Sequence, residues 1–359
     1  MEAAQVGNER PMPRLRRVDC SGPGIVRRRR GRGFEYVDED GERIDELEIL
    51  DRIRELVIPP AWENVWICPY PFGHIQAVAT DAAGRRQYIY HQRWRERRDQ
   101  EKFDEMTRFA RALPGVRNTA ARHLGSKGMP RQRVLACAVR LLDRGFFRIG
   151  TEGYAEQNQT YGLATMQKRH VTLGDDYVIT FDFIAKGGKR RVQSIVDPKV
   201  YAVVEVLKRR RSGRELLAYQ RGRRWVDVRS DDINDYIKEI TGEGFSAKDF
   251  RTWSATVIAA VGLAVSGRAA ATKTARQRAI ARAIKEVSYY LGNTPAVCRA
   301  SYIDPRVFDR YRDGFTIGGA LDLLGEGVDL GQPSFQGFVE EAVLDLLEDE
   351  RTPAIEKVA

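Results

Sequence analysis

HVTLGDDYVITFDFIAKGGKRRVQSIV, residues 170–196, is the stretch that decides the fold class of the larger part of this chain. Turn residues interrupt it twice, at Gly174-Asp175-Asp176 and at Ala185-Lys186-Gly187-Gly188. Between the turns, aromatic and apolar side chains recur at every second position from Tyr177 to Phe183. A two-residue period between Gly-rich turns is typical of antiparallel strands. We therefore predict a three-stranded antiparallel sheet in this stretch.

The sequence on either side of the stretch has a helical pattern. Before it, apolar side chains recur at three- and four-residue spacing between Trp94 and Leu113. After it, helical patterns resume at Lys199, continue through a basic segment at 268–291 and end with an acidic helix after Pro333. The uncharged window from Thr252 to Gly267 is shorter than the roughly 20 residues of a membrane-spanning helix, so we interpret it as a buried helix.

Residues 34–90 have the pattern of a small β-rich unit. Short apolar runs at 65–68, 75–79 and 87–90 are separated by Pro and Gly. Charge and hydrophobic period both change near residue 98, where we place a domain boundary. The predicted fold class is α+β: a β-rich domain over 34–98, and a mainly helical domain over 99–359 that contains the three-stranded sheet.

The charge distribution favours a nucleic-acid partner. The chain has 60 Lys and Arg against 50 Asp and Glu, a formal net charge of +10. The excess is concentrated in residues 1–33, 85–98 and 182–224, whereas residues 340–359 are acidic. Concentrated cations suit a surface that neutralises phosphates. Because residues 1–33 combine nine arginines with little apolar content, we predict a disordered basic arm there.

Several other classes of site are disfavoured. The four cysteines and four histidines show no metal-binding spacing, and there is no secretory signal, so we expect reduced cysteines, no metal and a cytoplasmic location. The segment 267–274 resembles a phosphate-binding P-loop, but Thr272 stands where that motif needs its second Gly, and no strand precedes it. We therefore expect no ATP site and no cofactor.

Breaking a phosphodiester without metal or ATP needs a nucleophile, cations on the non-bridging oxygens and an acid for the leaving alkoxide. Arginine suits the oxygens because its planar fork stays protonated and donates to two of them at once. Lysine becomes an acid when neighbouring cations lower its pKa. Tyrosine becomes a nucleophile when positive charge stabilises its phenolate.

Six motifs carry these residue types in a fixed order. They are Gln87-Tyr88-Ile89-Tyr90 with Arg93-Trp94, Phe147-Arg148-Ile149-Gly150 with Tyr154, Tyr161-Gly162-Leu163, Phe183-Ile184-Ala185-Lys186, Lys248-Asp249-Phe250-Arg251-Thr252, and Leu291-Gly292-Asn293-Thr294-Pro295 leading to Tyr302. In their order and spacing the chain resembles the type IB DNA topoisomerases, particularly the compact poxvirus-like and bacterial forms. The resemblance covers most of residues 34–310.

The resemblance implies a catalytic set. Tyr302 would attack the scissile phosphate and become linked to the 3′ end, Arg148 and Arg251 would hold the non-bridging oxygens, and Lys186 would protonate the leaving 5′ oxygen. Asn293 stands where the family commonly has histidine, and the resemblance places it against a phosphate oxygen. An asparagine amide can donate a neutral hydrogen bond there but cannot shuttle a proton, so we expect Asn293 to act as a donor.

The resemblance also implies DNA-contacting residues: Gln87, Tyr88, Tyr90, Arg93 and Tyr154. Glutamine can bond base edges, and tyrosines can contact phosphates or bases. On a strand, however, Tyr88 and Tyr90 share one face and Gln87 points to the other. Buried structural roles remain the alternative for these tyrosines and for Tyr154.

The expected protein is a monomeric, nucleoid-associated, two-domain clamp around duplex DNA. It would nick one strand through Tyr302, let torsion swivel the free 5′ end and reseal the strand, relaxing supercoils of either sign. A tyrosine recombinase has the same chemistry, but Lys248 stands where recombinases usually have histidine, and their first domain is helical. A noncatalytic DNA-binding protein would leave the ordered Arg148, Lys186, Arg251 and Tyr302 unexplained.

Overall fold

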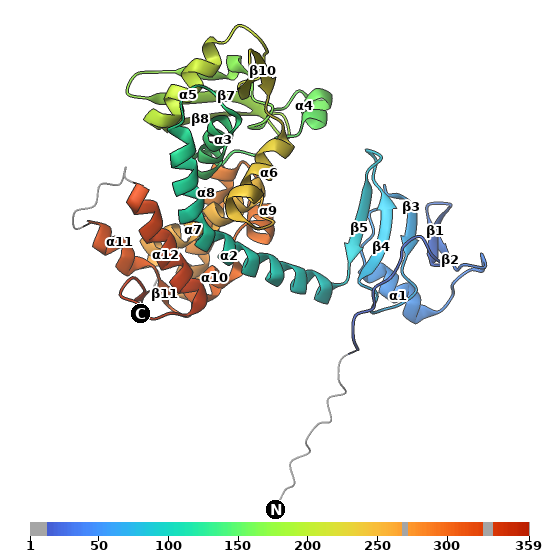
Figure 1. The fold of residues 1–359 in the computed structure, drawn as a ribbon. Coiled ribbons are helices and arrows are strands. Elements are labelled where there is room, and N and C mark those ends of the chain that lie inside the picture. Colours follow the sequence, from blue (N-terminus) through green and yellow to red (C-terminus); the bar gives the residue numbers. More distant parts are fainter. Residues whose placement is uncertain (1–12, 268–271, 326–332, 359) are drawn as a thin grey trace, which may run out of the picture. The chain divides into compact units, whose positions relative to one another are not determined.

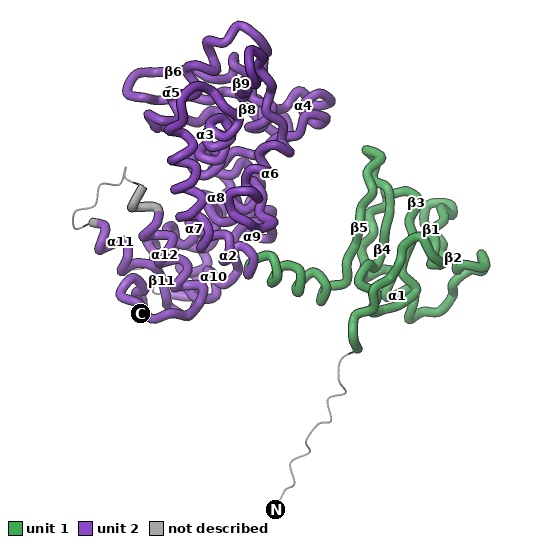
Figure 2. The backbone as a smooth tube through the Cα atoms, in the orientation of Figure 1, with its two compact units in different colours: residues 1–103 green, residues 104–359 purple. Residues whose placement is uncertain are grey.

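The computed structural model describes residues 13–267, 272–325 and 333–358. By their internal contacts the residues divide into two compact units, Met1–Phe103 and Asp104–Ala359 (Figure 2). The division falls within one helix, α2 (Gln92–Leu124), which also contains the boundary that we predicted near residue 98.

Unit 1 is built on a five-stranded antiparallel sheet with strand order β2-β1-β3-β4-β5 (Figure 1). Its elements are β1 (Ile25–Arg30), β2 (Gly33–Val37), α1 (Leu47–Glu55), β3 (Glu63–Ile67), β4 (Ile75–Thr80) and β5 (Arg86–Tyr90). Side chains of α1 pack with Val65, Ile67 and Ala77 of the sheet to form the core of this unit. The β-rich prediction is confirmed.

The predicted disordered arm is wrong for residues 25–33, because Arg27–Arg30 lie in β1, which pairs with β2 and β3. The run of arginines belongs to a strand whose first residue, Ile25, is buried. Arg27 donates to the backbone oxygens of Pro59 and Trp62, so its charge is satisfied inside the fold. Residues 1–12 of the predicted arm lie outside the described residues.

Unit 2 is mainly helical. Its helices beyond α2 are α3 (Arg131–Gly145), α4 (Glu152–Asn158), η1 (Lys168–His170), α5 (Pro198–Arg209), α6 (Ser230–Thr241), α7 (Ala247–Gly267), α8 (Lys273–Leu291), α9 (Pro295–Ser301), α10 (Pro305–Arg312), α11 (Gly318–Gly325) and α12 (Pro333–Glu348). Its strands are β6 (Val171–Leu173), β7 (Val178–Ala185), β8 (Lys189–Val196), β9 (Ala218–Arg221), β10 (Arg224–Asp227), β11 (Phe315–Thr316) and β12 (Glu356–Lys357). The predicted three-stranded meander is confirmed as the antiparallel sheet β6-β7-β8.

The helix α7 is the centre of unit 2. It contacts α3, α6, α8, α10, α11 and α12, and Phe250, Trp253 and Leu263 are buried. By length and composition alone, α7 could cross a membrane. However, 61% of its most apolar 18-residue segment is buried inside the protein, as expected for the buried helix that the sequence predicts here. Because α7 also carries Arg251, the core fixes the backbone from which this side chain projects.

Candidate active site

The C-terminal end of α8 gathers three arginines, one from β8, one from α7 and one from the loop between α3 and α4. Arg191 of β8 donates to the backbone oxygen of Tyr290, Arg251 of α7 donates to that of Leu291 at 2.9 Å, and Arg148 donates to that of Gly292 at 3.2 Å. The last carbonyls of a helix lack partners within the helix and carry partial negative charge. The end of α8 therefore attracts and orders guanidinium groups.

Asn293 joins two of these arginines directly. Its side-chain oxygen accepts hydrogen bonds from Arg148 at 2.8 Å and from Arg251 at 2.9 Å. Since arginine can only donate, the amide oxygen must face both guanidinium groups, which turns the amide NH2 toward other partners. The residue before it, Gly292, has a φ of +62°, a left-handed conformation in which glycine avoids strain. The helix end and its glycine thus set the direction of the Asn293 side chain.

Arg251 is almost completely buried, with 4% of its surface exposed. It donates to the backbone oxygen of Phe146 as well as to Leu291 and Asn293. Burial lowers the pKa of Arg251 to about 10, an effect that the nearby phenol of Tyr302 opposes. The guanidinium therefore stays charged at neutral pH, and its many acceptors fix its orientation.

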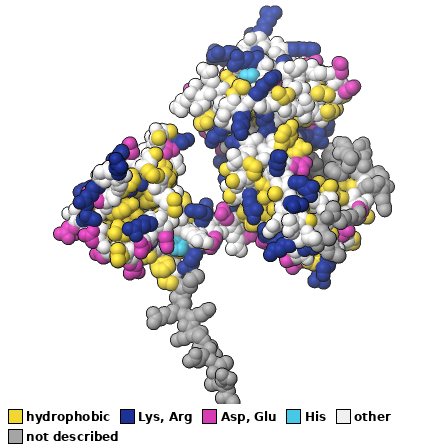
Figure 3. All heavy atoms as spheres, turned by 180° about the vertical axis from the view of Figure 1, so that it is seen from behind, with side chains coloured by type: hydrophobic (Ala, Val, Ile, Leu, Met, Phe, Trp, Pro, Cys, Tyr) yellow, Lys and Arg dark blue, Asp and Glu magenta, His cyan; other side chains and the backbone are white. Residues whose placement is uncertain are grey.

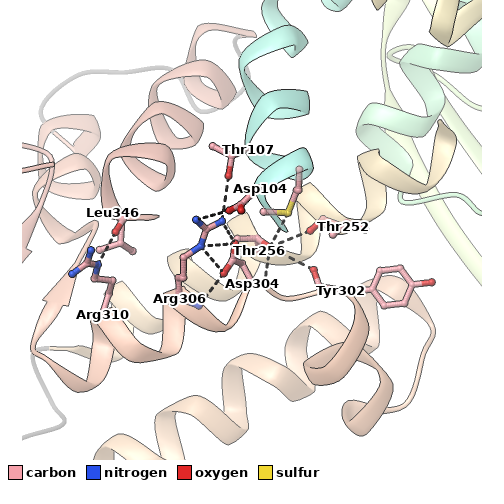
Figure 4. A network of polar contacts seen from close by, with 10 residues as sticks. Asp104, Thr107, Thr252, Thr256, Tyr302, Asp304, Arg306, Arg310 and Leu346 are labelled. Atoms are coloured by element: carbon pink, nitrogen blue, oxygen red, sulfur yellow. Dashed lines mark hydrogen bonds and ion pairs between the residues drawn. The ribbon is translucent and has the colours of Figure 1, made fainter. Parts of the chain in front are cut away.

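Tyr302 lies beside Arg251, at the end of α9. The guanidinium carbon of Arg251 lies 5.5 Å from the centre of the Tyr302 ring. The backbone that follows the ring is tied to α7: Thr256 Oγ1 lies 3.4 Å from the Tyr302 carbonyl oxygen and accepts from the Asp304 amide at 3.1 Å. Figure 4 shows the phenol pointing away from this buried network. One helix, α7, therefore positions both Arg251 and the phenol.

Lys186 lies at the tip of the β7–β8 hairpin. Gly187 and Gly188 complete the turn with φ values of +85° and +73°. The Lys186 ammonium lies 5.2 Å from the centre of the Tyr154 ring, where a cation is attracted to the aromatic face. Lys186 and Arg148 line the same two pockets, so the hairpin brings the ammonium to the side of the arginines.

The larger of these pockets has a volume of about 630 Å³ and a strongly cationic wall. Its basic residues are Arg144, Arg148, Lys186, Lys189, Arg190, Arg191 and Arg251. Among the described residues that line it there is no Asp or Glu. An electropositive pocket of this kind suits a phosphate group, which can bring negative charge to several guanidinium groups at once. On the face drawn in Figure 3, Lys and Arg side chains also lie over both units, interrupted by hydrophobic patches.

The predicted DNA-contacting residues fall in three places. Tyr88 and Tyr90 project from the open face of β5, 40% and 38% exposed, with stacked rings whose centres are 6.0 Å apart. Gln87 points to the other face, where it donates to Asp81 at 2.8 Å. Tyr88 and Tyr90 are therefore not core residues, and Gln87 does not share their surface.

Arg93 and Tyr154 make contacts elsewhere. Arg93, in the first turn of α2, is half-buried and donates to the backbone oxygen of Pro13 at 2.7 Å. Tyr154, on α4, is 37% exposed and faces Lys186. Tyr154 lines the smaller of the two pockets together with Arg148 and Lys186, and a buried core role for it is excluded.

Sequence reasoning missed two residues of this site. Arg191 was counted only as part of a basic segment, and Thr256 only as part of an apolar helix. A signal for Arg191 was available, because it lies on the hairpin that carries Lys186. In the described part of the chain, no group of three or more His, Cys, Asp or Glu side chains is arranged to hold a metal ion.

Comparison with known proteins gives matches over both units. The family model for the eukaryotic DNA topoisomerase I catalytic core matches residues 91–315, and that for the bacterial DNA topoisomerase IB N-terminal domain matches residues 33–81. DNA topoisomerase 1B of Acanthamoeba polyphaga mimivirus is 30% identical over 297 residues, 81% of this chain and 88% of the relative. DNA topoisomerase 1B of vaccinia virus, strain Copenhagen, is 21% identical over 238 residues, 66% of this chain and 72% of that protein. DNA topoisomerase 1 of Daucus carota is 26% identical over 159 residues, 44% of this chain and 19% of that longer protein.

Proposed function

Because the chain belongs to the type IB family of DNA topoisomerases, we propose that it relaxes supercoiled duplex DNA by cutting and resealing one strand through Tyr302. The observation that carries this proposal is the convergence of Arg148 and Arg251 on Asn293, with the ring of Tyr302 beside Arg251. The proposal assigns a task to each of these side chains.

A phosphate held by the arginines would be activated for attack. The two guanidinium groups would donate to its non-bridging oxygens, where negative charge builds up in the transition state. The amide NH2 of Asn293, which has no hydrogen-bond partner among the described residues, would donate a further neutral hydrogen bond. The phenolic oxygen of Tyr302 would form a bond to phosphorus as it loses its proton to solvent, and the nearby charge of Arg251 would stabilise the phenolate.

Lys186 would complete the cleavage step. As the bond from phosphorus to the 5′ oxygen breaks, its ammonium would give a proton to that oxygen, which becomes a 5′ hydroxyl. The protein would then be joined to the 3′ phosphate. Lys186 lies on an exposed hairpin tip next to the arginine pocket, a place from which it could reach a strand bound there.

Resealing would be the reverse of this step. The phosphotyrosyl ester keeps the energy of the broken bond, so the free 5′ hydroxyl can attack it without ATP or a metal ion. Torsional strain alone would turn the free end between cleavage and resealing, so supercoils of either sign would be relaxed. We propose duplex DNA as the partner of a protein that acts as a monomer.

The test is relaxation of a supercoiled plasmid in EDTA without ATP, by the parent and by Tyr302→Phe. We expect the parent to relax the plasmid and the variant to bind it without relaxing it. Stopping the reaction with detergent should leave the protein joined to a DNA 3′ end; attachment to a 5′ end would disprove the mechanism. A recombinase would instead need paired sites and give rearranged products, and a noncatalytic binder would shift DNA without nicking it.

A further inference from the structure

The hairpin that carries Lys186 is held close to its tip on both strands. In the register of the sheet, Phe183 of β7 is opposite Arg191 of β8, two pairs before the turn. Phe183 is 5% exposed and stacks with Phe147 at 6.1 Å. Beyond this pair Arg190 is exposed and Ile184 is 39% exposed. Phe183 is buried and Arg191 is half-buried, so theirs is the cross-strand pair nearest the tip in which neither side chain is exposed.

Arg191 is the residue of β8 nearest the tip that has a hydrogen bond outside the hairpin, among the residues that the structure describes. It donates to the backbone oxygen of Tyr290 and, within β8, to the side-chain oxygen of Gln193 at 2.8 Å. On β7, the Tyr161 amide donates to the backbone oxygen of Ile184 at 2.8 Å. The β8 side of the tip is thus tied to the end of α8 by one side chain.

The end of α8 is shaped to receive this side chain. A Cβ atom at Gly292 would lie 2.6 Å from Nη1 of Arg191, so the glycine makes room for the guanidinium. No ion pair holds Arg191 among the described residues, and burial together with the charge of Arg148 lowers its pKa. Among the described residues, this cation is held by two uncharged acceptors, the backbone oxygen of Tyr290 and the side-chain oxygen of Gln193. The guanidinium of Arg191 is therefore held in place by directed hydrogen bonds and not by an ion pair with a described residue.

We propose that Arg191 is a positioning residue that ties the Lys186 hairpin to the end of α8, three residues before Asn293. This hydrogen bond fixes the position of Lys186, the proposed general acid, relative to the residues that would hold the phosphate. This inference rests on the proposed function, because it assigns to Arg191 a task in the protonation of the leaving oxygen. Arg191 itself would act through Lys186 and not on the phosphate.

The test compares two DNA substrates that differ in one atom at the cleavage site. One has the normal 5′ bridging oxygen, and the other has sulfur there, which leaves as a thiolate without needing a proton. Arg191→Ala should slow single-turnover cleavage of the oxygen substrate by roughly 10- to 100-fold, a partial loss of the roughly 100- to 10,000-fold that general-acid catalysis contributes. Cleavage of the sulfur substrate should stay within roughly threefold of the parent rate.

The quantity that decides is the ratio of the sulfur rate to the oxygen rate. A loss of folded protein lowers both rates equally and leaves the ratio unchanged, so poor folding of the variant cannot imitate the expected result. Arg191→Lys, which can still donate to the Tyr290 oxygen, should bring the ratio most of the way back to the parent value. An unchanged ratio for Arg191→Ala, with equal losses on both substrates, would overturn the proposal.

Asp182→Asn is the matched control on the same hairpin. Asp182 pairs across the strands with Arg190 at 2.6 Å, and both side chains are exposed, so the variant removes a link within the hairpin and none to α8. Its ratio should equal that of the parent. Failure of the proposed function would look different: the parent would cleave neither substrate, or Tyr302→Phe would still cleave the sulfur substrate.

Discussion

Arg251 donates a hydrogen bond of 2.9 Å to the side-chain oxygen of Asn293, and this contact fixes which atoms of the asparagine remain available. Arg148 donates to the same oxygen at 2.8 Å. With the oxygen occupied, the asparagine can offer a phosphate only its NH2 group, which donates and carries no charge. A histidine at this position would also offer a donor, whereas an aspartate would not.

Asn293→Asp should therefore retain the fold and lose activity. The carboxylate would pair with both arginines and would occupy the donors that a phosphate needs, so we expect single-turnover cleavage to fall by roughly 100-fold, the order found when a transition-state donor is removed. Asn293→His, which keeps a donor, should stay within roughly 10-fold of the parent. Cleavage by Asn293→Asp at the parent rate would show that the NH2 group has no role.

The Thr256 hydroxyl provides a second prediction, because it connects α7 to the backbone around Tyr302. Thr256→Val keeps the shape but leaves the buried Asp304 amide without its acceptor, which should lower the free energy of unfolding by about 1–3 kcal/mol. Cleavage should slow while DNA affinity is unchanged, since only the placement of the phenol is altered. Thr256→Ser keeps the hydroxyl and is the matched control. Urea unfolding, DNA binding and single-turnover cleavage measure the three effects.

Much of this fold could be predicted because its signals are local. The alternating side chains between Tyr177 and Phe183 and the helical spacing after Trp94 each lie within one element, and both predictions are confirmed. The strand β1 was missed because a run of arginines looks like a solvated segment. Whether Arg27 faces water or the backbone oxygens of Pro59 and Trp62 depends on pairing with distant strands, which composition does not reveal.

In the candidate site, too, residues in local motifs could be predicted, whereas residues defined by distant contacts could not. Arg148, Lys186, Arg251, Asn293 and Tyr302 could be predicted as candidates because each lies in a recognisable motif. Arg191 was not identified because its partner, Tyr290, is 99 residues away, and their contact depends on the register of the hairpin and on where α8 ends. Thr256 lies in an apolar helix, and nothing in the local sequence indicates that its hydroxyl accepts from the Asp304 amide in the turn after Tyr302.

The buried ion pairs of Glu340 give a third prediction. Glu340 on α12 pairs with Arg117 of α2, which also pairs with Asp143 of α3, and it accepts from Trp253 of α7 at 2.9 Å. Burial lowers the pKa of Arg117, but the hydrogen bonds to Glu340 and Asp143 outweigh it and raise the pKa overall. Glu340→Ala should lower the free energy of unfolding by about 3 kcal/mol, because it leaves a buried charge partly unpaired.

The neighbouring Glu341 is exposed, so Glu341→Ala is the control and should change the free energy of unfolding by less than about 0.5 kcal/mol. Equal effects of the two substitutions in urea unfolding would mean that the network does not stabilise the packing of α12.

The two faces of β5 give a fourth prediction. Tyr88 and Tyr90 are exposed and stacked, whereas Gln87 on the other face is bonded to Asp81. The double variant Tyr88→Ala/Tyr90→Ala should weaken binding of duplex DNA by roughly 10-fold or more, since each phenol can donate to a phosphate and a hydrogen bond to a charged group contributes about 1.5–3 kcal/mol. Gln87→Ala should leave affinity nearly unchanged. A larger loss for Gln87→Ala in a titration at fixed salt would place the DNA on the opposite face.

The segment before β1 should respond to pH through His74. Its Nδ1 accepts from the Val18 amide at 3.1 Å, so this contact requires an unprotonated nitrogen. Burial and the charge of Arg17 lower the pKa of His74 below the usual histidine value of about 6.5. Protonation is thus disfavoured when the segment is docked. The contribution of His74 to stability is present above pH 6.5 and is lost as the pH falls through the lowered pKa.

Hydrogen exchange at Val18, corrected for the intrinsic rate, should show protection that decreases between pH 7.5 and pH 5. His74→Asn, whose side-chain oxygen can accept from the same amide without titrating, should show protection independent of pH, and an equal decrease in the variant would assign the effect to another group.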